Sequence, residues 1–169
     1  AALTVLQDMG IDAFGLNCST GAQMLPQLRR LRAYARVPLI AKPSAGLPVM
    51  VDGRAVYDCS PEAFASCVPA MLDSGVMIFG GCCGTTPEFI KLLNGTFAGC
   101  TPGRPAHRMP SVLCTPVDTV TVDGITVVGE RINPTGKKRF QQALREGDMN
   151  YVLEQAVSQA EAGAQILDV

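Results

Sequence analysis

Residues 76–84, VMIFGGCCG, combine a short apolar run with a glycine-rich turn and indicate one unit of an α/β fold. The run over residues 76–79 is uninterrupted, as is typical of a strand that is covered on both faces. The turn leads to Thr86, Pro87 and Glu88, a sequence that is typical of a helix N-terminus. The stretch therefore predicts a strand, a turn and a helix in succession.

The same unit recurs upstream of this stretch. Residues 11–17, IDAFGLN, predict a strand before a helix over 25–35, and residues 37–41, VPLIA, predict a second strand before a long loop. Ser60 predicts the start of a further helix, with one apolar stripe that faces a core. The stripe comprises Phe64, Cys67, Val68, Met71 and Leu72. Pro69 lies inside this helix and should kink it.

The pattern is interrupted once and then restarts. Residues 98–123 are rich in Pro, Gly, Thr and Ser without a sustained period, and they predict a linker. Residues 125–128 then predict a strand, which a turn with the sequence GERINPTG follows. A helix is expected over 138–145, and Asp148 should cap a longer one. Residues 165–169 predict the start of another strand.

Strands that alternate with helices predict an α/β fold with a parallel sheet covered by helices. The two architectures that fit are a doubly wound sheet and a (β/α)8 TIM barrel. A barrel typically needs about 250 residues, whereas residues 1–97 hold only three strand–helix units. No barrel can close within this length, and we therefore expect a fragment of a longer protein.

Composition and charge exclude several classes of protein. The chain has 169 residues and a net charge of -1, and no basic block suggests nucleic acid or an anionic membrane. No apolar run reaches the 18 or so residues that span a bilayer. The seven cysteines are an odd number, which is awkward for a secreted disulfide-bonded domain. We therefore expect a cytoplasmic protein whose cysteines bind metal, react or pack in a core.

Three of the cysteines should share one edge of the sheet. Cys18 follows the first predicted strand, and Cys82 and Cys83 follow the third. Functional residues of parallel α/β folds gather at the C-terminal ends of the strands. Cys67 belongs to the apolar stripe and should lie in the core. The other cysteines are in predicted loops without informative spacing, namely Cys59, Cys100 and Cys114.

The trio has the composition of a catalytic zinc site. Adjacent cysteines such as Cys82 and Cys83 pair poorly in a disulfide, but both can bind one ion where the neighbouring glycines leave the backbone permissive. Three protein ligands with one open position are typical of catalytic zinc. Such an ion would hold a small thiol as its thiolate, which favours alkyl transfer to sulfur.

Other interpretations remain open at this point. The adjacent cysteines could be small residues in a turn, and spacing alone fits that interpretation as well. A zinc-binding or redox-responsive scaffold without catalysis is a second alternative, although no fourth ligand for a structural zinc is evident in the sequence. His107 lies in the predicted linker, where a surface position explains it better than metal ligation.

Two motifs resemble the homocysteine S-methyltransferase family. They are GLNC at residues 15–18 and GGCCGT at residues 80–85. The resemblance implies that Cys18, Cys82 and Cys83 hold zinc, and that zinc holds the homocysteine sulfur. Residues 42–48, KPSAGLP, resemble the Pro-Asn-Ala-Gly loop of the family, with Ser44 where Asn is usual. Members that use another methyl donor, such as S-methylmethionine or betaine, are the nearest alternative.

The second half resembles a different domain. Residues 128–136, VGERINPTG, and 163–169, GAQILDV, are similar to the first strands of the pterin-binding barrel in cobalamin-dependent methionine synthases. The resemblance implies that residues 1–97 are the C-terminal part of a homocysteine-binding domain. Residues 98–123 would be the linker, and residues 124–169 the N-terminal part of a pterin-binding domain. The resemblance thus implies the last βα units of one (β/α)8 TIM barrel, followed by the first βα unit of a second TIM barrel.

This second resemblance implies a reaction in which 5-methyltetrahydrofolate supplies a methyl group, through methylcobalamin, to zinc-activated homocysteine. The cobalamin-binding module would lie beyond Val169, and the fragment alone should have no turnover. Folate contacts are expected from Asn133, Arg139, Phe140 and Gln141. Lys137 and Lys138 could meet the glutamate tail of folate or simply form a solvated helix start. Bracing of the barrel mouth by Glu130 and Arg131, and by Asn133 itself, remains an alternative.

Overall fold

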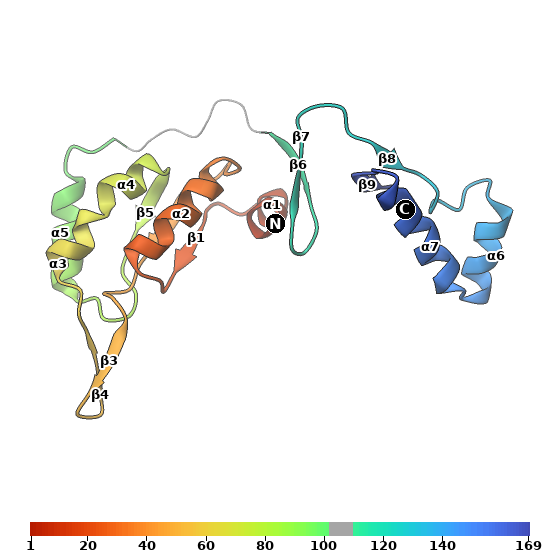
Figure 1. Ribbon diagram of the computed structural model, residues 1–169. Helices are drawn as coiled ribbons and strands as arrows, with labels where there is room; N and C mark the ends of the chain where they lie inside the picture. Colours follow the sequence, from red (N-terminus) through yellow and green to blue (C-terminus); the bar gives the residue numbers. More distant parts are fainter. Residues whose placement is uncertain (102–109) are drawn as a thin grey trace. The chain divides into compact units, whose positions relative to one another are not determined.

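The computed structural model describes residues 1–101 and 110–169, and Figure 1 shows the elements along the chain. His107 lies outside the described residues. The chain divides into two compact units, the first comprising Ala1–Pro110 with Cys114–Asp118, and the second Ser111–Leu113 with Thr119–Val169. Within the described residues, no helix combines the length and the apolar character needed to cross a membrane.

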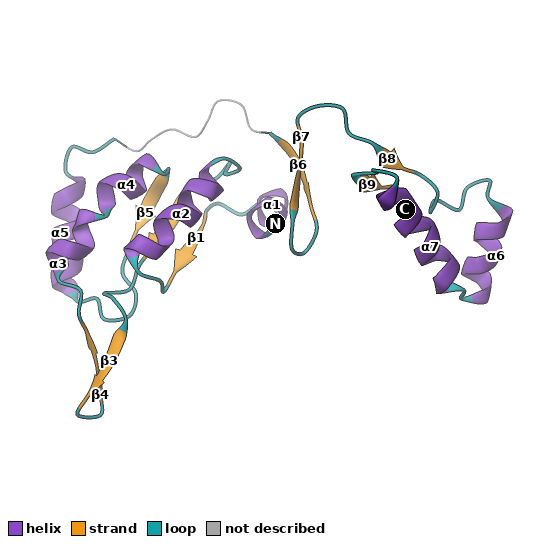
Figure 2. Ribbon diagram, viewed as in Figure 1, coloured by secondary structure: helices purple, strands orange, loops and turns teal. Residues whose placement is uncertain are grey.

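A three-stranded parallel sheet forms the centre of the first unit (Figure 2). It contains β1 (Phe14–Asn17), β2 (Leu39–Lys42) and β5 (Val76–Phe79), in the order β1-β2-β5. Asn17 pairs with Lys42, and Ala41 pairs with Phe79, so the three strands end at the same edge. The three predicted strands are therefore confirmed, although β1 begins three residues later than the apolar pattern suggests.

Helices pack on this sheet and on one another in two clusters. They are α1 (Ala2–Asp8), α2 (Gly21–Arg32), α3 (Pro61–Ser66), α4 (Val68–Asp73) and α5 (Pro87–Phe97). The first core cluster consists of Leu3, Met24, Leu28, Ala35, Leu39, Ala41, Met71 and Val76. The second consists of Ala45, Phe64, Val68, Leu72, Phe89 and Leu93. The side chain of Thr20 caps α2 in a capping box with Gln23, which fixes where this helix leaves the β1 loop.

The helix predicted after Ser60 is broken into two. Helix α3 ends at Ser66, and α4 begins at Val68 with Pro69 in its first turn. Because proline has no N–H and its ring crowds the preceding turn, a continuous helix cannot pass this position without distortion. The expected kink is confirmed. The apolar stripe is buried as predicted, and Cys67 is half-buried against the first core cluster.

The loop predicted after the second strand contains a hairpin instead. Strands β3 (Pro48–Val51) and β4 (Arg54–Tyr57) pair antiparallel, and Figure 1 shows them extending away from the sheet. Asp52 and Gly53 both have positive φ, 50° and 75°, which is the geometry of a two-residue type I′ turn. The expectation of a long loop was wrong for this segment, because an Asp-Gly pair between two short valine-containing runs favours a hairpin.

A second hairpin lies in the segment that was expected to be a linker. Strands β6 (Ser111–Cys114) and β7 (Thr119–Val122) form a two-stranded sheet. The run TVTV favours a strand because β-branched residues fit a pleated surface. The turn between the strands is held by the Thr115 hydroxyl, which accepts hydrogen bonds from the N–H groups of Val117 and Asp118. Residues 98–123 are thus not irregular throughout, and Cys114 ends a strand.

The second unit contains one further strand–helix–helix–strand arrangement. Strand β8 (Val128–Gly129) pairs parallel with β9 (Ile166–Leu167), and α6 (Lys138–Glu146) and α7 (Met149–Glu161) lie between them in the chain. Asp148 caps α7 as predicted, since its carboxylate accepts from the Tyr151 N–H. The described chain is therefore mixed α/β with parallel strands, and neither of its parallel sheets closes into a barrel.

Candidate metal centre

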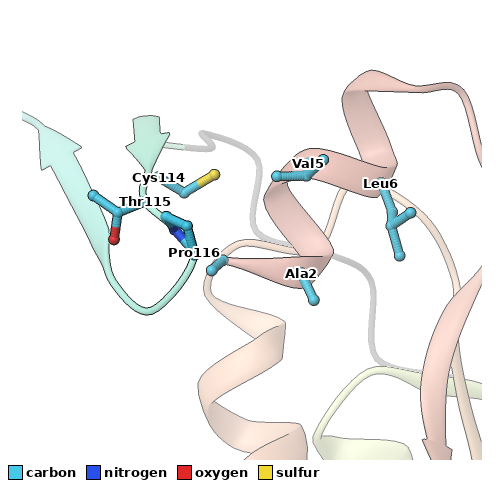
Figure 3. A pocket seen from close by; sticks show the side chains of 7 residues that line it. Ala2, Val5, Leu6, Cys114, Thr115 and Pro116 are labelled. Carbon is cyan, nitrogen blue, oxygen red and sulfur yellow. The ribbon is translucent and has the colours of Figure 1, made fainter.

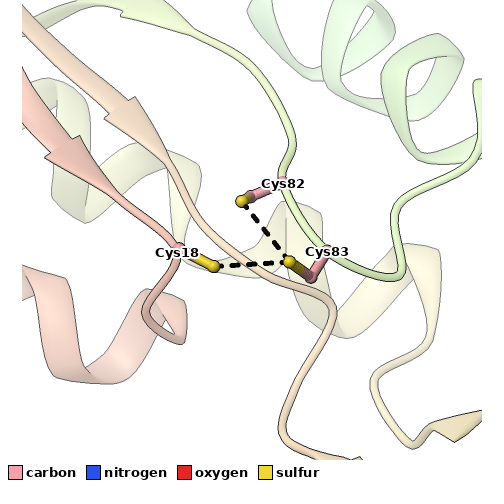
Figure 4. Close-up of side chains that lie close together, drawn as sticks. All are labelled: Cys18, Cys82 and Cys83. Atoms are coloured by element: carbon pink, nitrogen blue, oxygen red, sulfur yellow. Dashed lines mark hydrogen bonds between the residues drawn. The ribbon is translucent and has the colours of Figure 1, made fainter. Parts of the chain in front are cut away.

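The three predicted metal ligands lie together at the C-terminal edge of the first sheet. Cys18 directly follows β1, and Cys82 and Cys83 lie in the turn that follows β5. Figure 4 shows their side chains turned toward one another. The Sγ atoms of Cys18 and Cys83 are 3.3 Å apart, those of Cys82 and Cys83 are 3.8 Å apart, and all three lie within 4.8 Å of one another.

The loop after β2 holds the two cysteine segments together. The Cys18 N–H donates to the Lys42 carbonyl at 3.1 Å, and the Cys82 N–H donates to the Pro43 carbonyl at 2.9 Å. The Ala45 N–H in turn donates to the Cys83 carbonyl at 2.9 Å. Ser44 is buried and donates its hydroxyl to the Gly46 carbonyl. The middle strand therefore fixes the separation of the outer two loops.

Backbone conformation directs the cysteines toward one point. Cys18 has a φ of 63°, a left-handed conformation that costs a non-glycine residue about 1–2 kcal/mol. The turn after β5 closes on the Cys82 carbonyl, which accepts from both the N–H and the hydroxyl of Thr85. Gly84 in this turn has a φ of 78°. The strain at Cys18 is maintained by the hydrogen bonds around it, as is common at functional sites.

The donor set and its dimensions fit a zinc ion with an open position. With a Zn–S distance of about 2.3 Å and tetrahedral angles, sulfur ligands lie roughly 3.8 Å apart, and the two measured separations, 3.3 and 3.8 Å, are close to this value. In the part of the chain that the structure describes, this trio is the one group of His, Cys, Asp or Glu residues able to share an ion. Cys18 and Cys83 are exposed, so a small thiol could reach the centre.

The thiols influence one another electrostatically. Hydrogen bonds with Cys82 and Cys83, followed by their negative charges, raise the pKa of Cys18 to about 11. The hydrogen bond from Cys18 is in turn the main cause that lowers the pKa of Cys82, and the positive charge of Lys42 acts in the same direction. Without an ion, the trio thus retains a proton that a divalent cation would displace.

Two neighbours of the trio were not singled out by the sequence. Tyr57, at the end of β4, has a pKa that is raised by burial and then by the charge of Cys83 and a hydrogen bond to it. The Lys42 side chain lies along Gly80, whose Cα carries no side chain to block it. Recognition of the Asp52-Gly53 turn would have predicted the hairpin, but not that its last residue, Tyr57, lies beside the cysteines.

The remaining cysteines stay apart from the centre. Cys59 and Cys67 have pKa values that are raised chiefly by burial, and Cys67 donates to the Phe64 carbonyl at 2.9 Å. Cys100 follows the end of α5 and donates to the carbonyl of Thr96 in the last turn of that helix. All seven cysteines lie in the described residues and are free.

In the second unit, the residues predicted to contact folate fall into two groups. Asn133 lies between β8 and α6, and its amide donates to the Asp168 carboxylate, just after β9, at 3.4 Å. Gln141 donates to the Pro134 carbonyl at 2.9 Å. Phe140, by contrast, is only 3% exposed. It packs 6.2 Å from the Tyr151 ring, over which Arg139 also lies.

The two lysines of that region differ in their surroundings. The Lys137 ammonium pairs with the Glu130 carboxylate and donates to the Asn133 carbonyl at 3.0 Å. Lys138 is the first residue of α6. The structure thus brings Asn133, Glu130 and Lys137 together near the ends of the two strands, while Arg139 and Phe140 belong to the packing of α6 against α7.

The two pockets described in the first unit lie away from the cysteine trio. One of about 530 Å³ is lined by α1 and by the turn between β6 and β7 (Figure 3). Its lining consists of Ala1, Ala2, Val5, Leu6, Cys114, Thr115 and Pro116. A second, of about 300 Å³, is lined by Leu72, Met77, Phe79, Phe97 and Cys100. Neither contains a residue of the cysteine trio.

Known proteins resemble this chain over its whole length. The methionine synthases of Mycobacterium leprae (strain TN) and Mycobacterium tuberculosis (strain ATCC 25618 / H37Rv) are 36% and 37% identical to it over 179 and 174 residues. Both alignments cover 100% of this chain but 15% of the relative, so the chain spans about 15% of the length of these curated relatives. Residues 1–97 match the family described as Homocysteine S-methyltransferase. With more than half of its residues in that match, the chain belongs to the homocysteine S-methyltransferase family.

Proposed function

We propose that the chain supplies the zinc-binding part of a methionine synthase, in which homocysteine accepts a methyl group. The observation that carries this proposal is the meeting of three cysteine sulfurs, all within 4.8 Å, at the C-terminal edge of the sheet. The family match over residues 1–97 supports homocysteine as the substrate. The similarity to methionine synthases continues through the second unit, which supports this enzyme over family members with other methyl donors.

Each part of the site has a role in this proposal. A zinc ion would keep the homocysteine sulfur as a thiolate at neutral pH, which makes it a nucleophile for the methyl group. Cys18, Cys82 and Cys83 would hold the ion, and the loop after β2 keeps the two cysteine segments at a fixed separation. The three anionic cysteine sulfurs on the ion would keep the homocysteine sulfur, its fourth ligand, electron-rich. Because Cys18 and Cys83 are exposed, a thiol substrate could reach the ion from solvent.

The second unit would belong to the methyl-donor side of the reaction. Methylcobalamin, bound by another module, is the proposed direct donor, and 5-methyltetrahydrofolate is the proposed source of its methyl group. In this assignment residues 1–97 and 124–169 belong to two successive TIM barrels, joined by residues 98–123. Asn133 lies with Asp168 near the ends of β8 and β9, where ligands of parallel α/β folds bind, and this supports its assignment to folate. The free cysteines support a cytoplasmic location.

Metal analysis with single substitutions tests the zinc centre. The chain should bind one zinc per molecule, and Cys18→Ser, Cys82→Ser and Cys83→Ser should each lose most of it. Cys100→Ser, which alters an exposed cysteine outside the trio, is the matched control and should keep the ion. Circular dichroism of each variant separates loss of zinc from loss of fold. Retention of stoichiometric zinc in folded Cys83→Ser would overturn the assignment.

A second measurement separates a catalytic zinc from a scaffold. X-ray absorption at the zinc edge should show a lighter fourth ligand in the absence of substrate, and four sulfur ligands after addition of homocysteine. S-methylhomocysteine (methionine), which has no thiol, should leave the spectrum unchanged. A centre that binds zinc but never gains a sulfur from homocysteine would instead be a non-catalytic scaffold.

A further inference from the structure

Tyr57 connects the β3–β4 hairpin to the cysteine trio. It is the last residue of β4 and pairs with Pro48, so the end of the hairpin lies beside the loop after β2. Two residues later, the Cys59 N–H donates to the Ala45 carbonyl at 3.2 Å. Ala45 is the residue whose N–H holds the Cys83 carbonyl. The hairpin and the second cysteine segment are therefore anchored to the same residue.

The Tyr57 ring lies directly on the backbone of Gly84. A Cβ placed on Gly84 would overlap the Cγ of the ring, and the two Cδ atoms lie almost as near. The ring also packs against the second core cluster, which limits its movement. Glycine at this position is therefore needed for ring contact as well as for its positive φ of 78°. The residue before it is Cys83.

This placement brings the phenol close to Cys83, the residue before Gly84. The pKa of Tyr57 is raised by burial first and next by Cys83, and the charges of Cys18 and Cys82 act in the same direction. Cys83 is also the cysteine whose sulfur contacts both of the others, at 3.3 and 3.8 Å. A hydrogen bond donated to the Cys83 sulfur would therefore affect the one sulfur that contacts both of the others. The tyrosine comes from a different element than any of the three cysteines.

We infer that Tyr57 is a positioning residue of the metal centre, whose hydroxyl donates a hydrogen bond to the Cys83 thiolate while its ring holds the turn at Gly84. The inference deepens the proposed function and rests on the zinc centre named there. A donor on a metal-bound thiolate withdraws electron density from the sulfur and fixes its direction. Three thiolates and a homocysteine thiolate around one divalent ion carry excess negative charge, and a hydrogen bond to one of them offsets part of it.

Replacement by phenylalanine tests the hydroxyl alone. Tyr57→Phe keeps the ring on Gly84 and should leave the far-ultraviolet circular dichroism and the stoichiometry of zinc unchanged. Competition with a chromophoric chelator should show zinc affinity about tenfold to 100-fold lower, the range expected for a residue that supports a metal ligand. With Co²⁺ in place of zinc, the sulfur-to-metal charge-transfer band should move to longer wavelength, because the Cys83 sulfur becomes more electron-rich.

A control variant separates the loss of the Tyr57 hydroxyl from the loss of a tyrosine hydroxyl elsewhere in the fold. Tyr34→Phe removes a hydroxyl from a tyrosine that packs against the first core cluster, and it should change neither the affinity nor the Co²⁺ band. Unchanged affinity and an unchanged band in Tyr57→Phe would overturn the inference while leaving the zinc centre intact. Absence of zinc from the unsubstituted chain would instead overturn the proposed function.

Discussion

The Sγ atoms of Cys18 and Cys83 lie 3.3 Å apart, although 65 positions separate the two residues in the chain. Their segments belong to the two outer strands of the sheet, and the loop after the middle strand holds both through backbone hydrogen bonds. A metal ion at this point would join the first and last strands directly. Binding of the ion should therefore stabilise the folded sheet over the unfolded chain.

Zinc affinity should fall as the pH is lowered. A thiol must lose its proton to bind zinc, and in the metal-free chain its neighbours raise the pKa of Cys18 to about 11. We expect the apparent affinity to fall by about tenfold per pH unit for each proton displaced. Chelator competition at several pH values near neutrality measures this slope. A slope of zero in the unsubstituted chain would contradict thiolate ligation.

The folding stability of the metal-free chain should fall as the pH rises into the alkaline range. The pKa of Cys18 in the folded chain, about 11, exceeds its ordinary value of 9.0, chiefly because of hydrogen bonds with Cys82 and Cys83. The folded chain therefore holds this proton more tightly, and the resulting stability is complete below pH 9 and lost as the pH rises toward 11. Thermal unfolding in the presence of a chelator should show this loss. Cys18→Ser should lose less stability over the same range.

Burial of the first core cluster predicts a large effect at Leu28. This side chain is 0% exposed, within the cluster between α2 and the sheet. Leu28→Ala should lower the free energy of unfolding by about 2–5 kcal/mol, because it removes buried methyl groups and leaves a cavity. Leu47→Ala is the matched control, since Leu47 is 62% exposed, and it should change the free energy by about 0.5 kcal/mol or less. Urea denaturation measures both, and equal effects would contradict the prediction.

Much of the fold was predictable because its signals are local. Strand β5 is an uninterrupted apolar run, and Asp148 is a helix cap, so periodicity and capping chemistry predict both elements. The meeting of Cys18 with Cys82 was predictable from topology, since parallel strands that end together bring their loops to one edge. These predictions depend on residue type and spacing alone.

What could not be predicted depends on contacts between distant segments. Tyr57 reaches the trio because a hairpin returns to the sheet edge, and nothing within β4 indicates that its last residue lies on Gly84. The packing of α6 against α7 buries Phe140, which its sequence motif does not reveal, and its contact with folate stays a prediction. The hairpin β3–β4 itself was predictable from Asp52 and Gly53, and was missed because the segment was interpreted from its prolines and glycines alone.

Lys42 should contribute to zinc binding through its charge. Its side chain lies along Gly80, where a Cβ would come within 3.3 Å of the Lys42 Cγ. The pKa of Cys82 is lowered mainly by the hydrogen bond from Cys18 and partly by this ammonium group. Lys42→Met should raise that pKa and weaken zinc binding a few-fold, because the interaction between exposed charges is weak.

Salt and a matched lysine provide the controls for Lys42. The difference between Lys42→Met and the unsubstituted chain should shrink at high ionic strength, because salt screens exposed charges. Lys91→Met removes the same charge from α5 and should leave zinc affinity unchanged, while Lys42→Arg should restore it. An equal loss in both methionine variants would indicate an effect of net charge instead of one at Cys82.

Two glycines with nearly the same backbone conformation allow ring contact to be separated from backbone strain. Gly84 and Gly53 have φ values of 78° and 75°, so alanine at either position should cost about 1–2 kcal/mol through the left-handed conformation alone. At Gly53 an added Cβ meets nothing within 4 Å, whereas at Gly84 it overlaps the Tyr57 ring. Gly84→Ala should therefore destabilise the chain more than Gly53→Ala, and it should also weaken zinc binding because the ring and the turn beside Cys83 must move apart. Thermal unfolding of the metal-free variants and chelator competition of the zinc-loaded ones measure the two effects separately. If Gly84→Ala binds zinc as tightly as Gly53→Ala does, the contact between the ring and the turn has no part in holding the metal ligands.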